Sequence, residues 1–170
     1  MFSLNLQRPS QSEFRRSLHH DHTRLDRLFD KLVRACSMGE REQLDSLWKR
    51  FERGLRRHFK FEEREILPHF RRTQPEEAAE LEREHAELLA KLDQFGVAVD
   101  LHLLRADMVA QFVAELRAHA VHEDRVLYAW LDAQVNEHAG DWTGRARVAL
   151  HKLLSPSHGL EQHHTRRLTK

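Results

Sequence analysis

Residues 55–70 read LRRHFKFEEREILPHF, and this stretch decides the fold. Leu55 and Ile66 belong to a row of apolar residues at spacings of three and four, which marks the buried face of a helix. Between these two residues the same face passes through His58 and Glu62. The stretch therefore predicts a long helix whose buried face carries an imidazole and a carboxylate in place of apolar side chains.

Three further segments show the same apolar periodicity. The four predicted helices cover residues 10–39, 40–70, 75–96 and 100–137. Gly39 and Gly96 suit helix ends, Pro75 suits a first helical turn, and Pro68 predicts a kink or an end in the second helix. Short links between long helices favour antiparallel neighbours. The sequence thus predicts an all-α, antiparallel up-down-up-down four-helix bundle.

The domain organisation follows from where this periodicity stops. A chain of 170 residues is long enough for one domain with a real hydrophobic core. We assign residues 10–138 to the bundle and residues 139–170 to a short extra C-terminal helix and a basic tail. The extra helix, at about 143–154, is expected to pack on the outside of the bundle.

Charge and cysteine content narrow the class of protein. The 28 Lys and Arg residues nearly balance the 27 Asp and Glu residues and are interspersed with them, which gives no basic surface for nucleic acid or an anionic membrane. No apolar run has the length of a signal peptide or a membrane span. The single cysteine, Cys36, favours a reducing compartment. We therefore expect a cytoplasmic protein, either a monomer or a homodimer, that binds neither nucleic acid nor membrane.

The 14 histidines are the unusual feature of the composition, and some of them interrupt the apolar faces. Each predicted helix has at least one polar residue at a buried position. These residues are His22, His58, Glu62, His85, His119 and Glu123. A single histidine on an apolar face is usually a hydrogen-bonded core residue. Two buried carboxylates cost several kcal/mol each unless a positive charge compensates them, so the complete set indicates a bound multivalent cation.

An internal repeat links the two halves of the bundle. Residues 18–25 match residues 81–88, and residues 58–64 match residues 119–125 at identical spacing. Each half therefore supplies one helix with a lone inward histidine and one with His-x-x-x-Glu, whose two side chains lie on one helix face. Such a repeat favours a pseudo-symmetric site for two metal ions. Imidazole and carboxylate donors suit iron, manganese, zinc or copper.

Other metal motifs do not fit. The pair His122-Glu123 lacks the second histidine of a zinc protease. The ferritin-type pattern requires Glu-x-x-His on two bundle helices, and within the bundle only Glu82 and His85 supply it.

The ordered set resembles the hemerythrin family, specifically the bacterial hemerythrin-like or HHE cation-binding domains, over about residues 14–131. The resemblance rests on the motifs HHDHTRLD, HFKFEEREILPHF, EREHAELL and HAVHEDRVLYAWL. It implies a centre of two iron ions, with zinc or manganese as other possible metals. His22 and His58 would hold one ion, His85 and His119 the other. Glu62 and Glu123 would bridge them.

The chain departs from oxygen-carrying hemerythrins at two places. Leu81 takes the place of the first histidine of their His-x-x-x-His, which leaves an extra coordination position for a small ligand. Glu123 follows His119 by four residues, as in HHE domains, but Asp124 stands at the fifth place, and the sequence leaves open which of the two carboxylates bridges.

Two classes of function fit this centre. In the first, a non-haem di-iron protein of hemerythrin type binds or senses O2 or NO, or reports iron and redox state. In the second, an enzyme reduces peroxide, O2 or NO, or donates iron for repair of damaged iron centres. The sequence favours packing over chemistry for Tyr128, with a place near the metal as the open alternative, and it predicts that His122 faces away from the centre.

Overall fold

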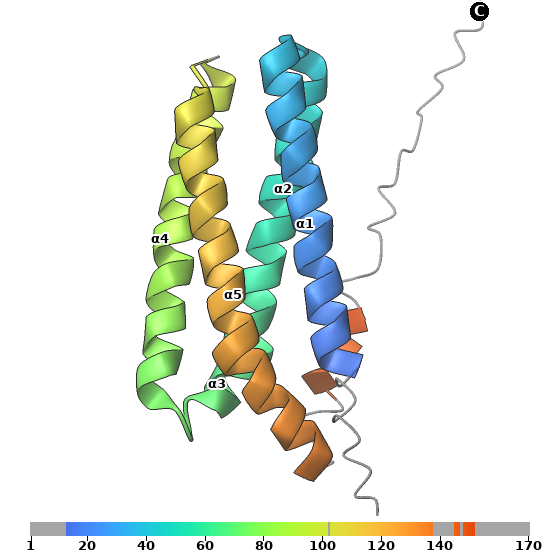
Figure 1. Cartoon of the computed structure of the whole chain (residues 1–170), viewed down its shortest axis with the longest axis vertical. Coiled ribbons are helices and arrows are strands. Elements are labelled where there is room, and N and C mark those ends of the chain that lie inside the picture. Colours follow the sequence, from blue (N-terminus) through green and yellow to red (C-terminus); the bar gives the residue numbers. More distant parts are fainter. Residues whose placement is uncertain (1–12, 102, 138–144, 147, 152–170) are drawn as a thin grey trace, which may run out of the picture.

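Four long helices run side by side, alternately up and down (Figure 1). The computed structural model describes residues 13–101, 103–137, 145–146 and 148–151. Its main elements are α1 (Glu13–Met38), α2 (Arg41–Phe61), η1 (Glu62–Ile66), α3 (Leu67–Phe70), α4 (Pro75–Asp100) and α5 (Ala106–Glu137). No strand occurs among the described residues, and the predicted all-α antiparallel bundle is confirmed.

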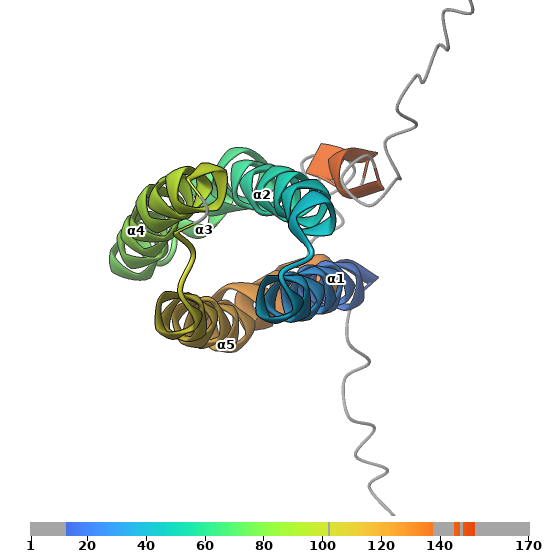
Figure 2. The same ribbon diagram turned by 90° about the horizontal axis from the view of Figure 1, so that it is seen from above.

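The helices surround a common axis. Helix α1 packs against α2 and α5, and α4 packs against the same two helices. Figure 2, seen along the bundle, shows this arrangement, and in the chain η1 and α3 follow α2 directly. Side chains from all four helices can therefore meet at one level of the axis.

Glycine and proline set two of the helix boundaries as predicted. Helix α1 ends at Met38, and Gly39 has φ 69°, a left-handed conformation that glycine adopts without a steric cost. The backbone N–H of Glu40 then donates to the Ala35 carbonyl at 3.0 Å, which satisfies an acceptor of the last turn. Pro75 occupies the first turn of α4, where its missing N–H costs no helical hydrogen bond.

The predicted boundary between the third and fourth helices was wrong. Helix α4 continues through Gly96 to Asp100, and α5 begins at Ala106. Glycine costs about 1 kcal/mol in a helix interior relative to alanine. Burial of Val99, which is 4% exposed, favours the additional turn, and Gly96 lies beside the Trp48 ring. Tertiary packing therefore outweighs local propensity at this position.

The interruption predicted near Pro68 takes the form of a π-helix. In η1 the Leu67 N–H donates to the Glu62 carbonyl, five residues back instead of four. Pro68 follows directly and has no N–H to donate to the preceding turn. The wider turn begins at Glu62, so the irregularity lies at one of the predicted metal ligands.

Two apolar clusters fill the core, and the polar residues lie between them. The larger cluster includes Leu25, Leu55, Leu88 and Phe112, and the smaller cluster includes Leu18, Ile66, Leu81 and Leu127. On every helix the inward histidine lies between a member of one cluster and a member of the other. The polar residues thus form a single layer that is covered by apolar side chains above and below.

Part of the extra C-terminal helix is also visible. Residues 145–146 and 148–151 are helical, and the buried side chains of Ala146 and Leu150 join the smaller cluster. The remainder of the predicted helix at 143–154, the boundary at 138/139 and the tail lie outside the described residues. None of the described helices combines the length and apolar character needed to cross a bilayer.

A matched pair of leucine substitutions tests this core. Leu92 is 0% exposed in the larger cluster, whereas Leu103, in the link before α5, is 64% exposed. We expect Leu92→Ala to lower the free energy of unfolding by about 2–5 kcal/mol. Leu103→Ala should change it by less than about 0.5 kcal/mol. Urea denaturation followed by circular dichroism measures both, and equal losses would contradict the assigned core.

Candidate metal centre

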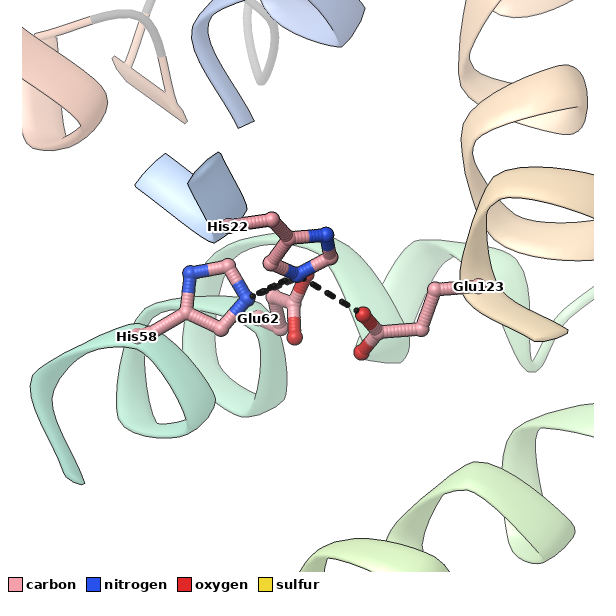
Figure 3. A group of neighbouring side chains, drawn as sticks. All are labelled: His22, His58, Glu62 and Glu123. Atoms are coloured by element: carbon pink, nitrogen blue, oxygen red, sulfur yellow. Dashed lines mark hydrogen bonds and ion pairs between the residues drawn. The ribbon is translucent and has the colours of Figure 1, made fainter. Parts of the chain in front are cut away.

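The predicted residues of α1, α2 and η1 converge on one point with Glu123 of α5 (Figure 3). His22 Nε2 lies 2.8 Å from His58 Nε2 and 3.1 Å from Glu123 Oε2. His58 Nε2 in turn lies 3.5 Å from Glu62 Oε1. The side chains of His58, Glu62 and Glu123 are fully buried, and that of His22 is 16% exposed.

The second half of the set lies next to the first. Glu123 Oε1 is 3.1 Å from His85 Nε2 and 2.9 Å from His119 Nε2. Glu62 Oε2 approaches His85 Nε2 at 3.5 Å. Each glutamate therefore contacts histidines of both halves of the bundle, as two bridging carboxylates would.

This donor set fits a pair of metal ions. Possible ligand atoms form two groups that share Glu123, and within each group they lie within 4.8 Å of one another. The first group consists of His22, His58, Glu62 and Glu123. The second consists of His85, His119 and Glu123. Glu62 Oε2 and His119 Nε2 have no partner in hydrogen-bond geometry within the described structure. Buried polar atoms without partners are costly, and a cation between these residues would satisfy both.

Three of the four histidines each have a carboxylate outside the layer that orients the imidazole ring. His58 Nδ1 lies 3.0 Å from Asp21 Oδ2, and His119 Nδ1 lies 2.6 Å from Glu84 Oε2. His85 Nδ1 contacts Glu63 at 3.2 Å. Each carboxylate accepts a hydrogen bond from Nδ1–H and so directs the lone pair of Nε2 into the layer.

Sequence reasoning did not assign these partners a role. Asp21 and Glu84 directly precede His22 and His85 in the repeated segments, so an acidic residue before the lone histidine was the available signal. Each of them orients a histidine on the neighbouring helix and not the one beside it in sequence. That pairing could be seen only once the helices were placed side by side.

Tyr128 lies at the site, although the sequence favoured a packing role over this alternative. Its side chain is fully buried, and its hydroxyl donates to Glu62 Oε1 at 2.6 Å. The hydroxyl also lies 3.2 Å from His22 Nε2 and 3.4 Å from Glu123 Oε2. Burial and the two carboxylates raise the pKa of Tyr128 well above its usual value, so the hydroxyl remains a hydrogen-bond donor.

The structure also separates Glu123 from Asp124. Asp124 lies outside the layer with 45% of its side chain exposed, and Arg15 Nη2 binds it at 2.9 Å. Glu123 is fully buried and contacts three of the four histidines. Of the two carboxylates that the sequence left open, Glu123 is the one that faces the centre.

The charged side chains of the layer shift one another's pKa values. Burial alone would lower the pKa of His58 and of His119, but nearby carboxylates, chiefly Glu62 and Glu123 respectively, raise both to about 9. Burial and the charge of Glu123 raise the pKa of Glu62 well above its usual range. Glu123 shows the opposite shift, because contacts with the histidines, chiefly His119, outweigh burial. A bound cation would replace the imidazolium protons, since ligating histidines must be neutral.

A cavity of about 410 Å³ reaches this layer from the side. It lies between α1 and α5 and ends at His22, His58 and His119, and its walls are mostly apolar. At the rim, Arg117 Nη2 binds Asp26 at 2.8 Å. A small molecule therefore has a largely apolar approach to the predicted ligands.

Comparison with known families agrees with this geometry. The model of the family described as "Hemerythrin HHE cation binding domain" matches residues 14–131, which include all six predicted ligands. The chain belongs to the hemerythrin HHE cation-binding family. No curated protein and no solved structure matches the chain significantly. Family membership shows a cation-binding domain, and the buried histidines and glutamates of this hemerythrin-like chain suit metal binding.

Two neighbouring residues of α5 provide a matched test of the ligand assignment. Glu123→Gln removes a carboxylate that faces both groups of histidines, so we expect the purified protein to lose at least half of its metal. Asp124→Asn alters a carboxylate outside the layer and should leave metal content unchanged. Elemental analysis by mass spectrometry measures both, with circular dichroism as the control for folding. Full metal content in Glu123→Gln would exclude a bridging role.

The orienting carboxylates can be tested in the same way. Asp21→Asn removes the charged acceptor of His58 Nδ1 and should weaken metal binding by about 10–100-fold. Asp26→Asn changes an aspartate of the same helix that pairs with Arg117 on the surface, and it should have no such effect. Competition with a chromophoric chelator gives both affinities. Equal affinities would contradict the orienting role.

Proposed function

We propose that this hemerythrin-like chain is a cytoplasmic non-haem di-iron protein that binds or senses O2 or NO, or reports iron and redox state. In this proposal His22 and His58 hold one iron, His85 and His119 hold the other, and Glu62 and Glu123 bridge them. The observation that carries it is the convergence of two fully buried carboxylates and four imidazoles in one layer.

Iron fits the donor set and is the metal that the resemblance to hemerythrins implies. Mixed imidazole and carboxylate ligands suit iron, with manganese and zinc as alternatives. Bound iron would supply reversible electron transfer to a small ligand such as O2 or NO. The residues of the chain hold the ions, exclude water and provide hydrogen bonds around them.

An open coordination position is supported by the surroundings of Leu81. This residue stands where oxygen-carrying hemerythrins have a histidine, four residues before His85. It is 0% exposed and packs in the smaller apolar cluster, so its side chain offers no donor to a metal. The iron held by His85 and His119 would therefore keep a position for a ligand.

The apolar cavity favours binding or sensing. Its aromatic and aliphatic walls, which include Phe29, Phe51 and Leu55, admit an uncharged diatomic molecule and disfavour water and ions. A dry approach slows irreversible oxidation of a reduced centre. Reversible binding of a small ligand needs both a path to the metal and protection of the reduced centre from irreversible oxidation.

The alternative is a di-iron enzyme that reduces peroxide, O2 or NO, or that donates iron for repair. Tyr128 is the observation that favours it. Its hydroxyl donates to Glu62 at 2.6 Å and lies near His22, so a proton donor stands beside the predicted metals. Reduction of bound oxygen or peroxide requires such a proton source.

Metal content and the visible spectrum test the proposal together. We expect about two irons per chain in protein from iron-replete cells, as six donors with two bridging carboxylates would hold. Absorption bands of the oxidised centre should bleach on reduction and return in air, and NO should change the spectrum of the reduced protein. Glu123→Gln serves as the control without an intact centre.

The outcomes separate the alternatives. Stoichiometric, reversible spectral changes favour binding or sensing, whereas repeated turnover of peroxide or NO favours the enzyme. Zinc as the sole metal, or no metal, would reject the di-iron proposal while leaving the fold intact.

A further inference from the structure

A second cluster of metal-binding side chains lies on the outer side of α4 and α5. A ring nitrogen of His122 and one carboxylate oxygen from each of Glu77 and Glu80 lie within 4.8 Å of one another. His122 Nε2 is 3.3 Å from Glu77 Oε2. Two ligands bound to one zinc ion at tetrahedral geometry stand about 3.4 Å apart, so this spacing suits a shared cation.

The ring of His122 is oriented as the predicted ligands of the core are. Its Nδ1 lies 2.8 Å from Glu84 Oε1, while Glu84 Oε2 holds His119 Nδ1 at 2.6 Å. One carboxylate therefore directs two imidazoles, one into the buried layer and one towards Glu77. A carboxylate behind the ring is the usual support of a metal-binding histidine. The His122 side chain is 12% exposed, so it remains accessible from the surface.

The internal repeat shows that the buried layer alone does not require this cluster. In the first half, Asp21 has the role of Glu84 and is held by Arg24 at 2.7 Å. The residue equivalent to His122 is Phe61, which packs in the smaller apolar cluster, and Glu80 corresponds to Ser17. The second half thus carries an imidazole and a carboxylate where the first half has neither.

We propose that His122, Glu77 and Glu80 form a peripheral site for a divalent cation, linked to the core through Glu84. One nitrogen and two oxygen donors suit Zn²⁺, Fe²⁺ or Mn²⁺, with water completing the coordination. Glu77 and Glu80 lie three residues apart on one face of α4, so a single ion can reach both. A cation held here is separated from the core ligand His119 by one carboxylate.

The competing explanation is that His122 only forms hydrogen bonds with Glu84 and Glu77, without a cation. It accounts for both ring nitrogens but assigns no role to Glu80. The two explanations differ in one measurable quantity, the number of zinc ions bound when His122 or Glu80 is altered.

Zinc titration of the full chain, prepared without an affinity tag, tests the site. The core metal content is measured first, and Zn²⁺ is then added at pH 7 in competition with a chromophoric chelator. We expect His122→Gln and Glu80→Gln to bind one zinc ion fewer than the unaltered chain, or to bind it at least about tenfold more weakly. Comparison between variants cancels zinc bound by other histidines.

Two further variants define the result. Glu42→Gln, an exposed residue of the first turn of α2, changes the same charge at the other end of the bundle and should bind zinc as the unaltered chain does. Glu84→Gln should lose the peripheral zinc and also weaken the core, whereas Glu80→Gln should leave core metal unchanged. Because Glu80 is exposed, its substitution does not threaten folding.

Equal zinc binding by the unaltered chain and Glu80→Gln would overturn the peripheral site. That comparison does not depend on which metal fills the core. The peripheral site can therefore be rejected without rejecting the di-iron proposal. Loss of core iron from Glu80→Gln would also contradict the assignment, because it would place Glu80 in the central site.

Discussion

The burial of Glu62 and Glu123 at the middle of the bundle is the constraint on which the rest of the structure depends. Each carboxylate is fully removed from water, and an uncompensated buried charge costs several kcal/mol. Four imidazoles surround the pair, and three of them are fixed by further carboxylates outside the layer. The apolar clusters above and below then prevent water from solvating the layer. A cation can balance the two carboxylates, whereas the apolar clusters cannot.

The internal repeat accounts for how one chain builds two similar halves. Asp21 orients His58 across α1 and α2, and Glu84 orients His119 across α4 and α5 in the same way. The halves differ at the other two histidines. Glu63 contacts His85, but its counterpart Asp124 is drawn outward by Arg15. The His22 side chain is also partly exposed and borders the cavity. Two metal positions in this layer would therefore be inequivalent, because the cavity is lined by both histidines of one half, His22 and His58, but by only one histidine of the other, His119.

Periodicity was sufficient to predict the helices and the inward positions, because an apolar face fixes which side chains meet at the axis. It placed His22 and Glu123 in one layer although they are far apart in sequence. It could not predict Tyr128, whose apolar ring suits the core and whose hydroxyl gains its role only from Glu62 on another helix. It also failed at Gly96, where local propensity favours an end but burial of the next turn favours continuation. Positions set by one helix were predictable, and contacts set by pairs of helices were not.

The two halves of the site differ beyond their shared His-x-x-x-Glu segments, since a π-helix begins at Glu62 but not at Glu123. Both His-x-x-x-Glu segments have the same spacing. Beyond Glu123, α5 continues as a regular α-helix, whereas at Glu62 the helix widens into η1 and then ends at Phe70. In the repeat, Tyr128 of α5 corresponds to Leu67, so only one half provides a hydroxyl. That hydroxyl lies closer to Glu62, at 2.6 Å, than to Glu123, at 3.4 Å, and Glu123 has the shorter contacts with imidazoles. The pKa values of the two carboxyls shift in opposite directions. The hydroxyl of Tyr128 therefore makes its shortest contact at Glu62, and a proton that it supplied to a bound ligand would be delivered on that side of the layer.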